Sequence, residues 1–178
     1  MKKTQKYSTY EIDNNNTQNI VSEPSVSYNM PSTNTPAGHI ISMMGMSGKK
    51  EYATIKDDND FINVIRTGLP RQAMTSIMSI ADISLLEMAS ITHTSDRTLR
   101  RYKPQQKLSE EQSERMIELA KLYTIGAVIF GNMEQFKQWM DTTLLTFGNK
   151  KPKEFLDTSM GIKMIMEEIG RIQHGIFA

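Results

Sequence analysis

From about residue 57 onward, apolar residues recur at spacings of three and four, which is the period of an amphipathic α-helix. The pattern begins in DDNDFINVIRTGLP, where acidic residues suit a helix N-terminus and Gly68 and Pro70 end the helix. It resumes in PRQAMTSIMSIA and in ISLLEMASI. No stretch in this part alternates apolar and polar residues as a half-buried strand does. We therefore predict an all-α fold.

The clearest helix start lies in LSEEQSERM, residues 108 to 116. Ser109 and Gln112 have the spacing of a capping box, in which each side chain accepts a hydrogen bond from the other residue's backbone. The second half of this helix, LYTIGAVIF, is apolar nearly all round. A helix with that pattern is buried, so we expect it to be the central helix of the fold.

Two further helical segments are expected after it, separated by a loop at TFGNKKP. In GNMEQFKQWM, the residues Phe136, Trp139 and Met140 share one side. The rest of the chain forms one or two helices with a single apolar stripe. The stripe consists of Ile162, Ile165, Ile169 and Ile172.

Residues 1 to 55 have a different composition, in which Asn, Ser, Thr, Pro and Gly dominate and no apolar period persists. Such a segment buries too little apolar surface to offset its chain entropy. We expect a disordered tail that is dispensable for the fold, with HIISMM at 39 to 44 as its one apolar patch. The remainder divides into a region over 56–107 and a helical region over 108–178.

Basic residues crowd the stretch TSDRTLRRYKPQQK, and no acid lies between the first and the last of them: Arg97, Arg100, Arg101, Lys103 and Lys107. On a helix that begins after Ser95 as N-cap, the three arginines lie on one side. Leu99 and Tyr102 point the opposite way. A helix this short is not stable alone in water, so Leu99 and Tyr102 must dock it on the preceding helices.

The arrangement of a helix, a four-residue turn and this basic helix is that of a helix-turn-helix, whose second helix enters the major groove. Arginine there binds guanine O6 and N7 and also phosphates. The alternative is an ordinary solvated basic face, because the formal net charge is only +1 and attraction for nucleic acid must be local. The residues predicted to contact DNA are Ser95, Arg97, Thr98, Arg100 and Arg101.

The composition argues against several kinds of active site. The chain has no cysteine, which excludes thiolate metal sites and thiol nucleophiles and fits a reducing cytoplasm. The three histidines, His39, His93 and His174, include no pair at helical metal-ligand spacing, and Glu167 and Glu168 diverge on their helix. No apolar run approaches ~18 residues, so no membrane span is expected. We expect a non-enzymatic cytoplasmic protein without a cofactor or metal.

Six motifs follow one another in a fixed order along the chain. They are GLP at 68–70, RTLRRY at 97–102, LSEEQSERM at 108–116, the FxxW of Phe136 and Trp139, PKEFLDTSMG at 152–161 and RIQHGIF at 171–177. In this order and spacing they resemble the Xre/MbcA/ParS antitoxin family, over roughly residues 60 to 178.

The resemblance implies an Xre-like helix-turn-helix followed by a small helical toxin-binding domain. It implies a bacterial toxin–antitoxin pair whose toxin is a RES-domain protein that consumes NAD, with the antitoxin blocking the active site. The implied partners are the cognate toxin, operator DNA and a second copy of the chain. One position departs from the family: Xre-type turns often carry glycine after the first helix, where this chain has His93, so we expect a positive φ there at some cost.

The resemblance also implies that the C-terminal region meets the toxin near its NAD pocket. The residues predicted to bind toxin are Met164, Glu168, Arg171 and His174. Gly175 after a helix is also an ordinary C-cap, but capping gives no reason for Arg171 and His174 one turn apart. Two functions stay open at this point: an antitoxin, or a stand-alone transcription regulator whose C-terminal helices only dimerise.

Overall fold

A computed structural model describes residues 35–175 of the 178-residue chain. In this part the regular structure is helical, apart from two isolated bridges, and the predicted all-α fold is confirmed. The α-helices are α1 (Pro36–Met43), α2 (Asp58–Thr67), α3 (Arg71–Ala81), α4 (Leu85–Ile91), α5 (Asp96–Arg101), α6 (Glu110–Ile129), α7 (Met133–Met140) and α8 (Ser159–Gln173). Three short 3-10 turns are η1 (Lys50–Tyr52), η2 (Leu145–Phe147) and η3 (Pro152–Phe155).

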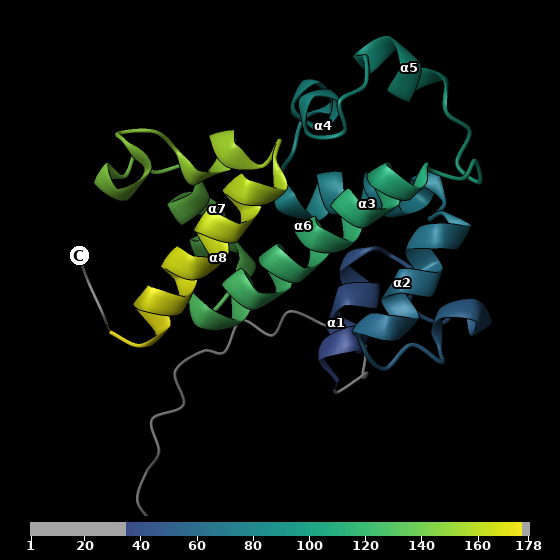
Figure 1. Ribbon diagram of the computed structural model, residues 1–178, viewed down its shortest axis with the longest axis horizontal. Coiled ribbons are helices and arrows are strands. Elements are labelled where there is room, and N and C mark those ends of the chain that lie inside the picture. Colours follow the sequence, from purple (N-terminus) through teal and green to yellow (C-terminus); the bar gives the residue numbers. More distant parts are fainter. Residues whose placement is uncertain (1–34, 176–178) are drawn as a thin grey trace, which may run out of the picture.

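Helix α6 is the central element, and it contacts α1, α2 and α3 as well as α7 and α8 (Figure 1). Its capping box is confirmed, because Gln112 N donates to Ser109 Oγ over 3.2 Å and Ser109 N donates to Gln112 Oε1 over 3.3 Å. The expectation that its second half is apolar all round and buried is wrong at two positions. Ile125 is 38% exposed and Val128 69% exposed.

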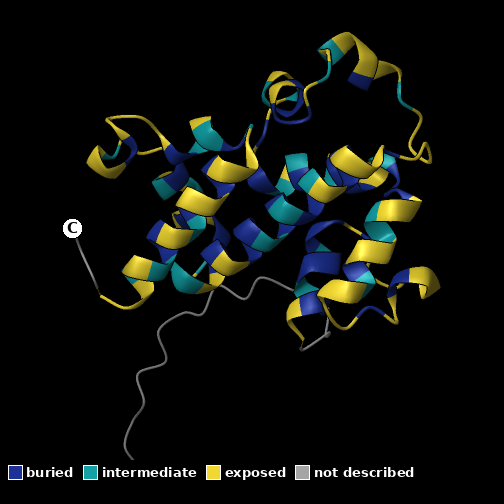
Figure 2. Cartoon of the chain, viewed as in Figure 1, coloured by how far each residue is buried: buried dark blue, intermediate teal, exposed yellow. Residues whose placement is uncertain are grey.

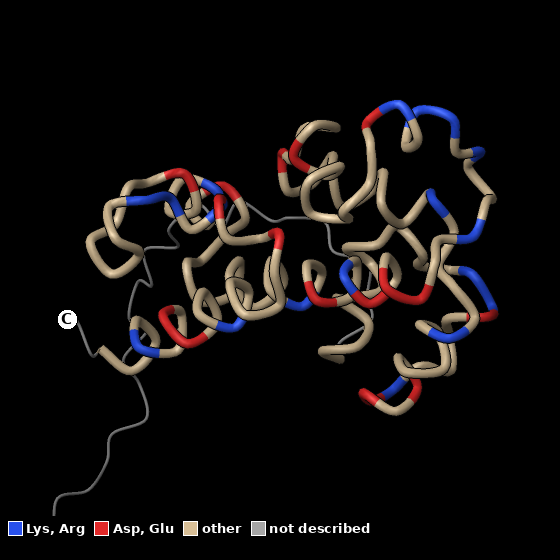
Figure 3. Tube along the Cα trace, turned by 45° about the horizontal axis from the view of Figure 1, so that its top comes forward, with Lys and Arg blue, Asp and Glu red and all other residues tan. Residues whose placement is uncertain are grey.

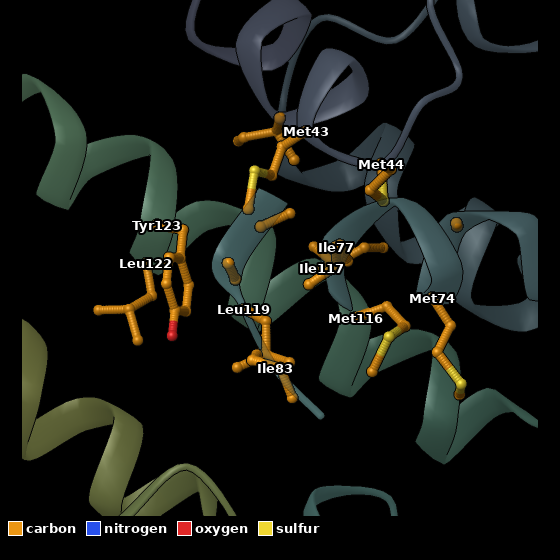
Figure 4. Close-up of a cluster of buried hydrophobic side chains, with 14 of the residues drawn as sticks. Met43, Met44, Met74, Ile77, Ile83, Met116, Ile117, Leu119, Leu122 and Tyr123 are labelled. Atoms are coloured by element: carbon orange, nitrogen blue, oxygen red, sulfur yellow. The ribbon is translucent and has the colours of Figure 1, made fainter. Parts of the chain in front are cut away.

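The segment from 36 to 55 corrects the prediction of a disordered tail ending at residue 55. Helix α1 packs on α3 and α6, and the apolar residues of this segment are buried (Figure 2). Met43 and Met44 join the cluster of Ile77 and Ile117 in Figure 4. The apolar run is short, but unbranched methionine side chains fill the gap between α3 and α6 well. Residues 36–50 are therefore part of the core and not dispensable, while 1–34 lie outside the described residues.

The C-terminal half is assembled around aromatic rings. Phe136 of α7 is fully buried against Gly126 of α6, where a Cβ atom would lie 2.5 Å from the ring. Met140 is also buried and Trp139 partly so, which confirms the predicted face of α7. On α8 the predicted apolar stripe is confirmed: Ile162, Ile165 and Ile169 are buried, and Ile172 is partly buried.

Over residues 35–175, no single helix is long and apolar enough to cross a membrane. Two pairs of helices, α3 with α4 and α6 with α7, are long and apolar enough only when the two helices are counted together. Their axes are bent by 120° and 110° at the breaks between them.

Candidate functional site

Helices α4 and α5 form a helix-turn-helix with a regular turn. Helix α4 begins with a capping box of Ser84 and Glu87, and α5 begins after Ser95. His93 has φ 50°, the left-handed conformation expected where glycine is usual. Thr94 N then donates to the carbonyl of Ala89 over 2.9 Å, which closes the end of α4. The histidine therefore occupies this turn without disrupting it.

Helix α5 carries an exposed arginine face over a single fully buried anchor. Arg97, Arg100 and Arg101 are exposed, whereas the accessible surface of Leu99 is 0%. Tyr102 is half-buried, and its hydroxyl accepts a hydrogen bond from Gln112 Nε2 of α6 over 3.4 Å. The prediction of docking on the preceding helices is thus confirmed for α4, while α6 supplies the polar contact of Tyr102.

Basic residues gather along α5 and the segment after it (Figure 3). Arg100 Nε lies 3.6 Å from Asp96 Oδ2, and both side chains are exposed, so this pair holds the arginine only weakly. Lys107 has a structural contact: its Nζ donates to the carbonyl of Gly68 over 2.7 Å. The cationic surface of this region therefore consists mainly of the α5 arginines and Lys103.

Ser95 and Thr98, the two hydroxyl residues predicted to contact DNA, form the N-terminal cap of α5. Ser95 Oγ accepts from Thr98 N over 3.1 Å, and the two hydroxyl oxygens are 2.8 Å apart. Both residues are exposed. All five residues predicted to contact DNA are therefore accessible to solvent.

The predicted toxin-binding residues lie on one side of α8, at different depths. Met164, Arg171 and His174 are exposed, and His174 is the C-cap residue of the helix. Glu168 is buried, with an exposed fraction of only 9%. Its Oε2 accepts from Arg171 Nε over 2.8 Å and also from Arg171 Nη2. Glu168 therefore fixes the direction of the Arg171 guanidinium group.

A groove beside the C-terminal end of α8 was not found from the sequence. It has a volume of about 430 Å³ and is open on one side. Its lining comes from the end of α6, α7, the 144–146 segment and α8: Phe130, Trp139, Leu144, Leu145, Thr146, Glu168 and Ile172. At its edge Leu145 is 82% exposed. The only sequence signal was the paired leucine in TLLTF, directly before and overlapping the predicted loop TFGNKKP.

A second hollow, of about 240 Å³, lies between α4 and the 151–157 segment and is lined by charged residues. There Lys153 Nζ lies 3.0 Å from Glu87 Oε1 and donates to the carbonyl of Asp82 over 3.1 Å. Partial burial raises the pKa of Glu87, but hydrogen bonds from Ser84 and Lys153 outweigh it, so this pKa lies below its ordinary value. Across this hollow, the contacts of Lys153 with Glu87 and Asp82 link the C-terminal part of the chain to the helix-turn-helix region. Among residues 35–175, no group of acidic or histidine side chains is arranged to hold a metal ion.

Comparison with known proteins divides the chain within the second half of α6, between residues 121 and 126. An antitoxin Xre-like helix-turn-helix domain matches residues 60–121, and an antitoxin Xre/MbcA/ParS C-terminal toxin-binding domain matches residues 126–175. The helix-turn-helix match includes most of α6, which the sequence-based division at 107 and 108 had assigned to the second region. Helix α1 precedes both matches.

Two curated proteins named "Antitoxin Xre" are similar to this chain. The one from Yersinia enterocolitica serotype O:8 / biotype 1B is 26% identical over 119 residues, which cover 66% of this chain and 80% of that protein. The one from Photorhabdus laumondii subsp. laumondii is 26% identical over 115 residues, which cover 64% of this chain and 78% of that protein. Both similarities are consistent with the two matched domains.

Proposed function

We propose that this chain, which belongs to the Xre/MbcA/ParS antitoxin family, neutralises a RES-type toxin that consumes NAD and represses its own operon. The chain has the helix-turn-helix and the toxin-binding domain of that family. The prediction that the protein is not an enzyme is supported by its membership of an antitoxin family. The observation that carries the proposal is that both domains present exposed arginine side chains, on α5 and at the end of α8.

Neutralisation takes place through the outer side of α8. Met164 supplies an adaptable apolar contact, and Arg171 and His174 lie closest to the NAD pocket of the toxin. The planar guanidinium group of Arg171, held by Glu168, pairs with acidic or carbonyl groups that the empty pocket leaves open. With this helix in place, NAD does not reach the toxin's active site.

Co-expression with the cognate toxin tests this proposal. The double variant Arg171→Ala, His174→Ala removes two exposed side chains, so the fold should persist while growth arrest and NAD loss return. The matched control is Lys163→Ala, Glu167→Ala, which removes an exposed ion pair from another part of the same helix. Full neutralisation by the first variant at equal expression would move the toxin contact away from this end of α8.

Repression depends on the arginine face of α5. One six-residue helix reaches few base edges, so we propose that two copies bind two half-sites within the toxin–antitoxin complex. Because operator DNA is the partner, we also propose that the protein acts in the cytoplasm. Light scattering of the purified protein, with and without toxin, measures the number of copies.

The exposed arginines also favour a second candidate, a stand-alone transcription regulator whose C-terminal helices only dimerise. Co-purification separates the two functions. A stoichiometric toxin that stays bound through residues 126–175 supports the antitoxin. A dimer that binds a palindromic site and retains no toxin supports the regulator.

A further inference from the structure

The groove lined by Phe130, Trp139 and Leu144 is separate from the outer side of α8 but adjoins it through Glu168. We propose that this groove is a second toxin-binding site, which receives one apolar side chain of the cognate toxin against Trp139 and Leu145. The inference rests on the proposed toxin-binding function and extends it to residues outside the predicted set.

The wall of the groove is held rigid by rings beneath it. The ring of Trp139 lies 5.1 Å from that of Phe130 and 5.8 Å from that of the fully buried Phe136. Phe147 contacts Trp139 edge-on at 6.3 Å. These are favourable separations for aromatic pairs, so the rings keep their places whether or not the groove is filled. A preformed wall binds without losing side-chain entropy, and that favours affinity.

Leu145 is held in an ordered turn although almost nothing in the described chain packs on it. Leu144 N donates to the carbonyl of Lys150 over 3.1 Å, and Gly148 and Asn149 adopt positive φ, so η2 has a fixed conformation. Within that turn Phe147 is buried, whereas Leu145 is 82% exposed. The turn therefore presents a leucine to solvent at the mouth of an aromatic groove, and its side chain lacks a structural role.

The position of the groove favours the toxin as the occupant. All of its lining residues fall within residues 126–175, the segment matched by the toxin-binding domain. Its rim includes Glu168, which holds Arg171. An apolar centre beside a polar, charged rim is the usual arrangement of an energetically dominant interface site. The volume of about 430 Å³ is ample for one large apolar side chain, and the open side admits one that is attached to a protein surface.

The chain contains one tryptophan, so the signal of a labelled tryptophan comes from Trp139 in the wall of this groove. The full-length protein is labelled with 5-fluorotryptophan, and its 19F resonance is followed while unlabelled purified toxin is added. We expect the resonance to shift as the toxin binds. Leu145→Asp should weaken toxin binding about tenfold or more, because a charge is forced into an apolar contact. The matched control is Leu86→Asp, at a leucine of α4 that is 69% exposed and outside the toxin-binding match, and its affinity should stay within about twofold of wild type.

Three results would overturn the inference, and they differ in what they leave standing. If wild type binds the toxin while the 19F resonance stays in place and Leu145→Asp binds equally well, the groove is not a contact but neutralisation by α8 survives. If the resonance shifts with the concentration of the free protein alone, a second copy occupies the groove instead. If wild type does not bind toxin at all, the proposed function itself fails.

Discussion

Helices α5 and α8 both present exposed arginine side chains, three on α5 and one on α8, but the fold supports them in different ways. Helix α5 has six residues and one fully buried side chain, Leu99. Helix α8 has fifteen residues and is anchored by Ile162, Ile165 and Ile169, with a glutamate that fixes its arginine. A helix of six residues has almost no stability of its own, so α5 exists only because the rest of the domain holds it.

The comparison indicates that the two proposed partners place different demands on the protein. A base edge or phosphate is reached by a long arginine side chain, and small movements of a weakly anchored helix are tolerated while the DNA orders it. An enzyme cleft needs a side chain held in one direction, which the contact between Glu168 and Arg171 provides. Leu99→Ala and Gly161→Ala each change the support of one helix, and their effects on DNA and toxin binding show whether the other helix is affected.

Removing the anchor of α5 should have the largest effect. Leu99→Ala leaves a cavity under a helix with no other fully buried residue, at a cost of ~2–5 kcal/mol in the free energy of unfolding. We expect DNA binding to be lost and toxin binding to persist at temperatures below unfolding. Urea unfolding, gel-shift and toxin pull-down measure the three quantities. Retention of wild-type DNA affinity would mean that α5 does not need this anchor.

The converse experiment separates α8 from the segment before it. Gly161 lies in the first turn of α8, so close to η3 that an added Cβ atom would lie 2.0 Å from the carbonyl oxygen of Phe155, which is backbone and does not yield easily. Gly161→Ala should therefore destabilise the protein by ~1–3 kcal/mol and weaken toxin binding more than DNA binding. Gly170→Ala, on the same helix with open space around it, is the control and should stabilise by up to ~1 kcal/mol. Equal stabilities for the two variants would show that η3 and α8 are not tightly packed.

The local features of these helices could be predicted from the sequence because each depends on a few neighbouring residues. The caps at Ser95 and Ser109 and the burial of Leu99 follow from spacing and residue type, whereas the positive φ of His93 was expected from the family resemblance. The stripe of isoleucines on α8 follows from its period. The all-α fold is the sum of such local signals.

The features that were missed depend on residues brought together by the fold. Helix α1 was not predicted because the average composition of a long segment is polar, although the segment contains a short apolar run. The residues that this run packs against are on α3 and α6. The groove has no local pattern, since Phe130, Trp139 and Ile172 meet only after α6, α7 and α8 have packed. The exposure of Val128 likewise depends on which sides of α6 the other helices leave open.

A third experiment asks what the arginines of α5 recognise. Arg100 is exposed, with only a weak pair to Asp96, so Arg100→Ala should leave folding unchanged. If Arg100 contacts a base, we expect a loss of ~1–3 kcal/mol that is larger for the operator than for unrelated DNA. If it contacts a phosphate, all sequences weaken alike and the salt dependence flattens by about one unit. Fluorescence anisotropy over a range of salt separates these patterns. If both Arg100→Ala and Arg101→Ala bind operator DNA with wild-type affinity, the arginine face of α5 is solvated surface and not a DNA contact.

The smallest expected effect concerns the link between the two helices, where Lys153 meets Glu87 beside the start of α4. The glutamate side chain is 42% exposed, so solvent screens the pair and Lys153→Met should cost only ~0.2–1 kcal/mol at neutral pH. Because the pKa of Glu87 is lower in the folded protein than its ordinary value, its contribution to stability is present above that value. The contribution is lost as the pH falls below about 4.5 and through the lower folded pKa.

Urea midpoints of wild type and Lys153→Met should therefore differ at pH 7 and converge as the pH falls towards 3. The control is Lys163→Met, whose ion pair with Glu167 lies within α8 and joins no other element, and its difference from wild type should be smaller at every pH. A constant difference between wild type and Lys153→Met over this range would mean that Lys153 acts through the carbonyl of Asp82, a contact that does not titrate. In that case the end of α3, rather than the cap of α4, is where the toxin-binding domain supports the helix-turn-helix.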